Sequence, residues 1–198
     1  MFPHRCRDES VESFAVEVNA EVARGRGSGG YSLSPVSLMK IEEPIRLVLP
    51  SPNGSTLSLA TGDALTVAGC LRNASAVAEH IGGKGRRIGV VPAGERWPDD
   101  SLRPALEDIL GAGAILSRLE GVKTAEAQTA VEMFECARPK LQDRIMSCVS
   151  GIELIERGYE RDVLIASELD VSECVPVLLE DKTDPLTPRA YVDVKTSG

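Results

Sequence analysis

The sequence is short of the residue types on which many common sites depend. Only two of its 198 residues are histidines, His4 and His80, and aromatic residues make up 4%. A metal site built on paired imidazoles, or a Ser-His-Asp triad, therefore has little material. We also find no Gly-rich dinucleotide fingerprint after a strand, no Walker loop and no His-Glu-x-x-His pair. These absences make a nucleotide-binding α/β domain the least favoured interpretation.

Long apolar runs and basic clusters are also missing. No apolar run approaches the ~18 residues that span a bilayer, and the first ten residues lack the apolar core of a signal peptide. The net charge is −8 and the pI about 4.9. The most basic stretch, 84–87, is typical of a solvated turn. We therefore expect no nucleic acid and no membrane among the partners.

The five cysteines are widely spaced and form no Cys-x-x-Cys pair. This pattern favours reduced thiols in a cytoplasmic protein over a disulfide framework or a zinc site. Cys70 is interpreted as a small apolar residue rather than a nucleophile.

The apolar pattern predicts an α/β centre followed by a helical C-terminal part. Residues 45–119 alternate strand and helix, as in a layered sheet. The strands are expected at Ile45–Leu49, Leu65–Ala68 and Arg87–Pro92, and the helices at Thr56–Thr61, Asn73–Ile81 and Ser101–Leu119. Further helices are expected within 1–25, after Ser34 with Pro35 at its first position, and at Thr124–Ala137, Lys140–Cys148, Ser150–Arg157 (capped by Ser150) and Asp162–Leu169. A late strand is expected at Val175–Leu179, before a loose tail from Asp181.

Acidic side chains gather in the segment Val90–Leu119. Glu95 follows Gly94 at the end of the third predicted strand, and Glu107 and Asp108 lie early in the next helix. Ligands of open α/β sheets bind outside the carboxyl ends of the strands, and carboxylate oxygens suit Mg²⁺. The alternative is that one carboxylate is solvated and the other pairs with a neighbour such as Arg103.

Two polar loops follow the first two predicted strands. Asn53, Gly54 and Ser55 precede one helix, and Arg72 and Asn73 precede the next. Backbone N–H groups at a helix start attract phosphate, and arginine binds anions with two hydrogen bonds. Because the two loops occupy equivalent positions after their strands, we expect both to emerge at one edge of the sheet. The alternatives are an ordinary turn with Ser55 as a helix cap, and a connection in which Asn73 caps a helix.

Four segments, taken in order, resemble the 2-phosphosulfolactate phosphatase family. They are PSPNGS (50–55), VAGCLRNASAVAEHI (67–81), VVPAGERW with SLRPALEDILGAGAI (90–115), and CVSGIELIERGYERDV (148–163). The resemblance covers about residues 31–180, and the combination of motifs at this spacing is specific.

The resemblance implies a three-layer α/β/α sandwich and a Mg²⁺-dependent hydrolase of coenzyme M biosynthesis. Such an enzyme hydrolyses 2-phospho-3-sulfolactate, or a related phosphorylated hydroxy acid, to sulfolactate and phosphate. On this basis Glu107, Asp108 and Glu95 are the expected catalytic residues, and the first two would hold the metal. The expected substrate-binding residues are Asn53, Gly54, Ser55, Arg72 and Asn73.

The front of the chain departs from the family pattern. Family members begin with an apolar strand, a helix and another strand, whereas no such strand is evident in residues 1–30. We therefore expect an atypical segment at 1–30, a phosphatase-like domain at 31–180 and a loose tail at 181–198, with a small, N-terminally truncated sheet. The alternative function is a non-catalytic remnant that binds anions. An uncovered sheet edge also favours a homodimer.

Overall fold

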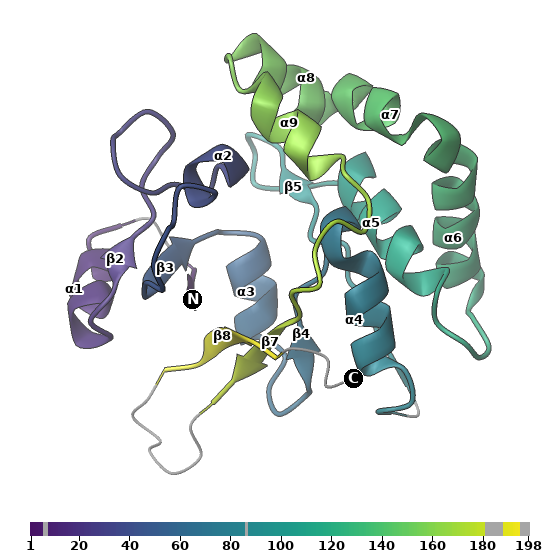
Figure 1. Ribbon diagram of the computed structural model, residues 1–198, viewed down its shortest axis with the longest axis horizontal. Helices are drawn as coiled ribbons and strands as arrows, with labels where there is room; N and C mark the ends of the chain where they lie inside the picture. The colour runs from purple at the N-terminus through teal and green to yellow at the C-terminus, as the bar shows by residue number, and fades with distance from the viewer. Residues whose placement is uncertain (6–7, 86, 181–187, 195–198) are drawn as a thin grey trace. The chain divides into compact units, whose positions relative to one another are not determined.

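The computed structural model describes residues 1–5, 8–85, 87–180 and 188–194. They fall into two compact units, which are considered separately below (Figure 1). The first comprises the described residues of Met1–Val67 and Pro176–Asp193, and the second comprises those of Ala68–Val175 together with Val194.

The first unit contains a three-stranded parallel sheet. Its order is β1 (Phe2–His4), β3 (Leu47–Pro50) and β2 (Glu21–Val22), so that β3 is central. Leu47 and Val48 of β3 are fully buried, as expected for a strand paired on both sides. Helix α1 (Ser10–Glu17) connects β1 to β2 and contributes Val11 and Ala15 to the same core.

This arrangement corrects the prediction that residues 1–30 hold no strand. The segment forms a strand, a helix and a second strand, which is the order thought to be missing. The two strands have three and two residues. Such short segments are too brief for an alternating pattern to identify them.

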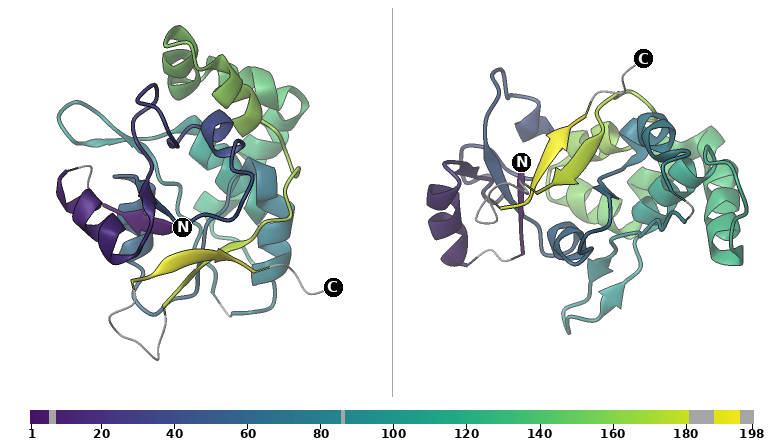
Figure 2. Two further views of the ribbon diagram at one scale, coloured as in Figure 1. Left: turned by 60° about the vertical axis from the view of Figure 1, so that its left-hand side comes forward. Right: turned by 90° about the horizontal axis from the view of Figure 1, so that it is seen from below.

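The remainder of the first unit is built from short elements. Helix α2 (Pro35–Leu38) begins after Ser34 with Pro35 first, as the sequence predicted; the Ser34 side chain caps it by accepting the N–H of Ser37. Helix α3 (Gly54–Leu59) follows β3. A separate antiparallel sheet has the order β4 (Thr66–Val67), β7 (Pro176–Leu179) and β8 (Ala190–Asp193), and Figure 2 shows β7 and β8 as an adjacent pair of arrows.

Two predictions about these strands are wrong. Strands β3 and β4 belong to different sheets, so the loops after them do not follow neighbouring strands of one sheet. Strand β8 lies in the tail that was expected to be loose, because its pairing with β7 holds it. The remaining part of that expectation falls on 181–187 and 195–198, outside the described residues.

The second unit is mainly helical. Helices α5 and α6 pack closely because Gly113 has no side chain: a Cβ there would lie 2.2 Å from the carbonyl oxygen of Ala130. Thr124 caps α6 by accepting the N–H of Ala127, at the predicted start of that helix. The helices are α4 (Ala74–Ile81), α5 (Leu106–Leu116), α6 (Ala125–Ala137), α7 (Leu141–Ser147), α8 (Val149–Glu156) and α9 (Glu160–Ala166), with 3-10 turns η1 (Leu71–Asn73) and η2 (Arg138–Lys140).

The segment before α5 differs most from its prediction. Residues 87–92 form no strand; Ile88 and Val91 are exposed, so these apolar side chains face water rather than a core. An antiparallel hairpin of β5 (Glu95–Arg96) and β6 (Leu102–Arg103) follows, visible in the right-hand view of Figure 2. Helix α5 therefore begins at Leu106, not at Ser101. Cys148, rather than Ser150, caps α8.

The predicted α/β class and helical C-terminal part are confirmed. Among the described residues, none of the helices is both long and apolar enough to cross a membrane.

Candidate functional site

The acidic residues of the second unit are organised by the turn at Gly94. The backbone of Gly94 has a positive φ of 71°, which glycine adopts without strain. Its N–H donates a 2.7 Å hydrogen bond to Oδ2 of Asp108, fourteen residues along the chain. A Cβ on Gly94 would lie 2.8 Å from Cδ1 of Leu102. The positive φ therefore favours glycine where the hairpin meets the start of α5, and a side chain there would also displace the exposed Leu102 side chain.

Three carboxylates influence one another around this turn. Glu107 and Asp108 occupy the first turn of α5, and Glu95 lies in β5; all three are half-buried. Burial raises the pKa of Asp108 from its ordinary value, and the charges of Glu107 and Glu95 raise it further, although the Gly94 N–H opposes them. A cation bound here would relieve this repulsion.

Glu107 has a second neighbour from a distant part of the chain. The thiol of Cys148 lies 3.4 Å from Oε2 of Glu107 and is buried. Burial raises the pKa of Cys148, and the charge of Glu107 adds to this although the Gly151 N–H opposes it, so the sulfur keeps its proton. The alternative partner considered for these carboxylates, Arg103, instead binds Glu153 through two 3.1 Å contacts. Arg103 therefore does not neutralise the acidic group.

Glu107 and Asp108 are the two residues that the sequence predicts to hold a metal ion. The described residues include no group of three or more His, Cys, Asp or Glu side chains placed to hold a metal. Mg²⁺ typically binds one or two carboxylates and takes its other ligands from water and substrate phosphate. Glu107 and Asp108 are consecutive residues in the first turn of α5, and the charges of Glu107 and Glu95 both act on Asp108.

The loop containing Arg72 and Asn73 is firmly attached to its surroundings. Asn73 is buried; its Oδ1 accepts the N–H of Cys70 at 2.8 Å, and its Nδ2 donates to Cys174 O at 2.9 Å. Arg72 is paired with Glu168 and donates to the carbonyl of Ile165. The Asn73 side chain thus shapes the backbone, whereas Arg72 is 29% exposed and would have to exchange a partner to bind an anion.

The Asn53-Gly54-Ser55 loop belongs to the first unit. Gly54 is the first residue of α3, with Asn53 directly before it. Ser55 is buried, and its hydroxyl donates a 3.0 Å hydrogen bond to the carbonyl of Leu49 in β3. This contact fixes the helix start against the strand end, so the hydroxyl is already engaged.

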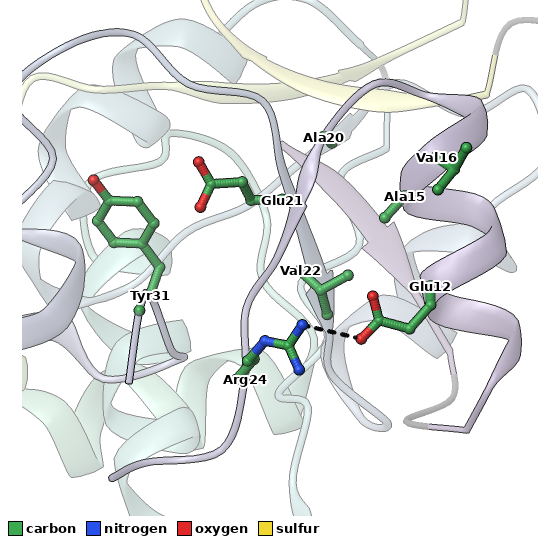
Figure 3. Close-up of a pocket in the computed structure, with 9 residues that line it drawn as sticks. Glu12, Ala15, Val16, Ala20, Glu21, Val22, Arg24 and Tyr31 are labelled. Atoms are coloured by element: carbon green, nitrogen blue, oxygen red, sulfur yellow. Dashed lines mark ion pairs between the residues drawn. The ribbon is translucent and has the colours of Figure 1, made fainter. Parts of the chain in front are cut away.

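A pocket of about 230 Å³ beside β2, in the first unit, was not foreseen from the sequence (Figure 3). Glu12 and Arg24 form a 3.3 Å ion pair on one side of it, and Glu21 and Tyr31 lie on the other. Two carboxylates and one guanidinium leave an excess of negative charge. A phosphorylated dianion is therefore a poor match for this pocket.

Gly94 and Cys148 were also missed as parts of the acidic region. The sequence gives a weak indication for Gly94, since a glycine before an acidic stretch suggests a turn that needs positive φ. The sequence gives no indication that Cys148 contacts Glu107, because forty-one positions separate the two residues.

Comparison with known proteins points to one family. The family model for 2-phosphosulpholactate phosphatase matches residues 25–181. A "Probable 2-phosphosulfolactate phosphatase" of Carboxydothermus hydrogenoformans is 34% identical over 133 residues, which is 66% of this chain and 54% of the relative. A protein of the same name from Pseudothermotoga lettingae is 27% identical over 156 residues, 77% of this chain and 66% of the relative. The chain thus spans between about half and two thirds of the length of these relatives. Because the family model covers most of the chain, the protein belongs to the 2-phosphosulfolactate phosphatase family.

Proposed function

We propose that this protein is a Mg²⁺-dependent phosphatase that hydrolyses 2-phospho-3-sulfolactate, or a related phosphorylated hydroxy acid, to sulfolactate and phosphate. The family match supports the reaction class and substrate type. The observation that carries the assignment to particular residues is the position of half-buried Asp108, which accepts the Gly94 N–H at 2.7 Å and whose pKa is raised by burial and by the charges of Glu107 and Glu95. Perturbed carboxylates of this kind concentrate at functional sites.

In this proposal Glu107 and Asp108 hold the metal, directly or through water. The cation would polarise a phosphoryl oxygen and offset its negative charge. The Gly94 N–H orients Asp108 by its 2.7 Å hydrogen bond, and Glu95 adds negative charge beside the pair. Hydrolysis breaks the bond between phosphorus and the 2-oxygen of the substrate and transfers the phosphoryl group to water.

We propose that two loops bind the negatively charged groups of the substrate. Arg72 would contribute its guanidinium by exchanging Glu168 for a substrate oxygen. Asn73 would act through the backbone that its amide holds in place. Asn53, Gly54 and Ser55 retain the substrate-binding role that the family resemblance implies, and that role depends on backbone N–H groups because the Ser55 hydroxyl bonds to Leu49.

The test is phosphate release from a panel of phosphorylated 2-hydroxy acids, with 2-phospho-3-sulfolactate among them. We expect turnover with Mg²⁺, its loss in EDTA and its recovery when Mg²⁺ is returned. Equal turnover without any divalent metal would refute the role of the acidic residues. No turnover of any substrate with Mg²⁺ would refute the activity for this chain and leave the anion-binding role.

A further inference from the structure

We infer that Cys148 is a positioning residue whose S–H group donates to the Glu107 carboxylate and fixes its orientation. The consequence for turnover rests on the proposed function, whereas the hydrogen bond itself can be tested without it. The thiol would act through Glu107 and would not touch substrate.

The geometry places the thiol between three partners. Its sulfur lies 3.4 Å from Oε2 of Glu107 and 3.1 Å from the carbonyl oxygen of Ile145, and it accepts the N–H of Gly151 at 3.4 Å. A thiol has one hydrogen, which points to one acceptor at a time. An ionised carboxylate is a stronger acceptor than a peptide carbonyl, so the S–H is expected to favour Glu107.

The position of the sulfur is set by the junction of α7 and α8. Cys148 is the residue between the two helices and caps α8. A Cβ on Gly151 would lie 2.1 Å from the carbonyl of Ile145, so only glycine allows the two helices to approach this closely. The junction therefore fixes the buried sulfur relative to α7 and α8, and the 3.4 Å contact with Glu107 links it to α5.

Capping and positioning use different parts of the thiol. The cap uses a sulfur lone pair, and the contact with Glu107 uses the proton. Cys148→Ser keeps both an acceptor and a donor, whereas Cys148→Ala removes both. A purely structural role would lower the stability of the alanine variant without changing the environment of Glu107.

The decisive experiment is infrared spectroscopy of the S–H stretch, which lies in a region free of other protein bands. The Cys148 band is identified by its loss in Cys148→Ser, with Cys136→Ser, an exposed cysteine on α6, as the matched control. We expect this band to move to higher wavenumber in Glu107→Gln, because a neutral amide accepts less strongly. A band that does not move would overturn the inference, whether or not the protein is a phosphatase.

Turnover supplies the second measurement. We expect Cys148→Ala to lower kcat about three- to tenfold, since a hydrogen bond to a charged group is lost. Cys148→Ser should recover most of this loss, and Cys136→Ala should change nothing. Full turnover in Cys148→Ala would contradict a positioning role. If the wild-type protein shows no turnover, the proposed function fails while the infrared result still decides the contact.

Discussion

Asn73 and Asp108 are both polar residues near helix starts in the second unit, yet their surroundings differ. The amide of Asn73 is buried and matched to the backbone groups of Cys70 and Cys174. The carboxylate of Asp108 has one backbone donor, Gly94, and two like-charged neighbours. The first arrangement satisfies a polar group completely, and the second leaves unfavourable charge in place.

This difference separates a structural role from a functional one. A paired buried amide contributes to stability by removing unsatisfied backbone groups. Clustered carboxylates do not help the fold in the absence of a cation, because repulsion and desolvation oppose ionisation. Substitution should therefore affect stability at Asn73 and activity at the acidic pair.

The largest expected effect is on turnover. Glu107→Gln and Asp108→Asn remove a charge from the proposed metal pair while keeping side-chain size, and we expect kcat/KM to fall about 100-fold or more. Asp99→Asn is the matched control, because Asp99 is exposed and bonds only locally to Ser101. An equal loss of kcat/KM in all three variants would contradict a special role for Glu107 and Asp108, because Asp99 would then matter as much.

Asn73→Ala should mainly destabilise the protein. It leaves the Cys70 N–H and the Cys174 carbonyl without their partner, and we expect the free energy of unfolding to fall by about 2–4 kcal/mol. Denaturant titration measures this loss. Below the unfolding midpoint the folded variant should keep its kcat and lose at most substrate affinity, because Asn73 acts through the backbone that its amide holds. A stably folded variant with a much lower kcat would show that Asn73 contacts substrate.

Gly94→Ala should have a smaller effect on stability, of about 1–2 kcal/mol, because it strains the positive φ and crowds Leu102. The displaced N–H should also weaken the hold on Asp108. Thermal unfolding measures the loss of stability, and the Mg²⁺ concentration needed for turnover measures the weaker hold on Asp108. Gly121→Ala provides the comparison, since Gly121 also has positive φ but has open space around its Cβ position.

The smallest predicted effect is a pH dependence of stability without metal. The pKa of Asp108 is raised in the folded state, so the folded protein holds this proton to higher pH than the unfolded chain does. Its contribution is therefore most favourable below the ordinary aspartate pKa and is lost as pH rises through the raised value. Asp108→Asn should remove this decline in EDTA. Identical pH profiles for the variant and the wild type would contradict the raised pKa.

Sequence reasoning succeeded where a local pattern determines the structure. The helix predicted at Thr124–Ala137 is present as α6 (Ala125–Ala137), and Ser34 with Pro35 predicted the start of α2. It failed where distant contacts decide. The apolar residues at 87–92 resemble a strand, but Val91 is exposed and no strand forms there.

The candidate site shows the same division. The acidic residues could be found from composition and position, and Glu107 and Asp108 do lie in one helical turn beside Gly94. Their neighbours could not be found in this way. The pairing of Arg103 with Glu153 and the contact of Cys148 with Glu107 join residues forty or more positions apart.

The most direct test of the account is calorimetric titration of the full chain with Mg²⁺, because it needs no knowledge of the substrate. The account predicts that the wild-type protein and Asp99→Asn bind Mg²⁺ alike, and that Glu107→Gln and Asp108→Asn bind it at least about tenfold more weakly. An unchanged Mg²⁺ affinity in both Glu107→Gln and Asp108→Asn would contradict the claim that Glu107 and Asp108 hold the metal.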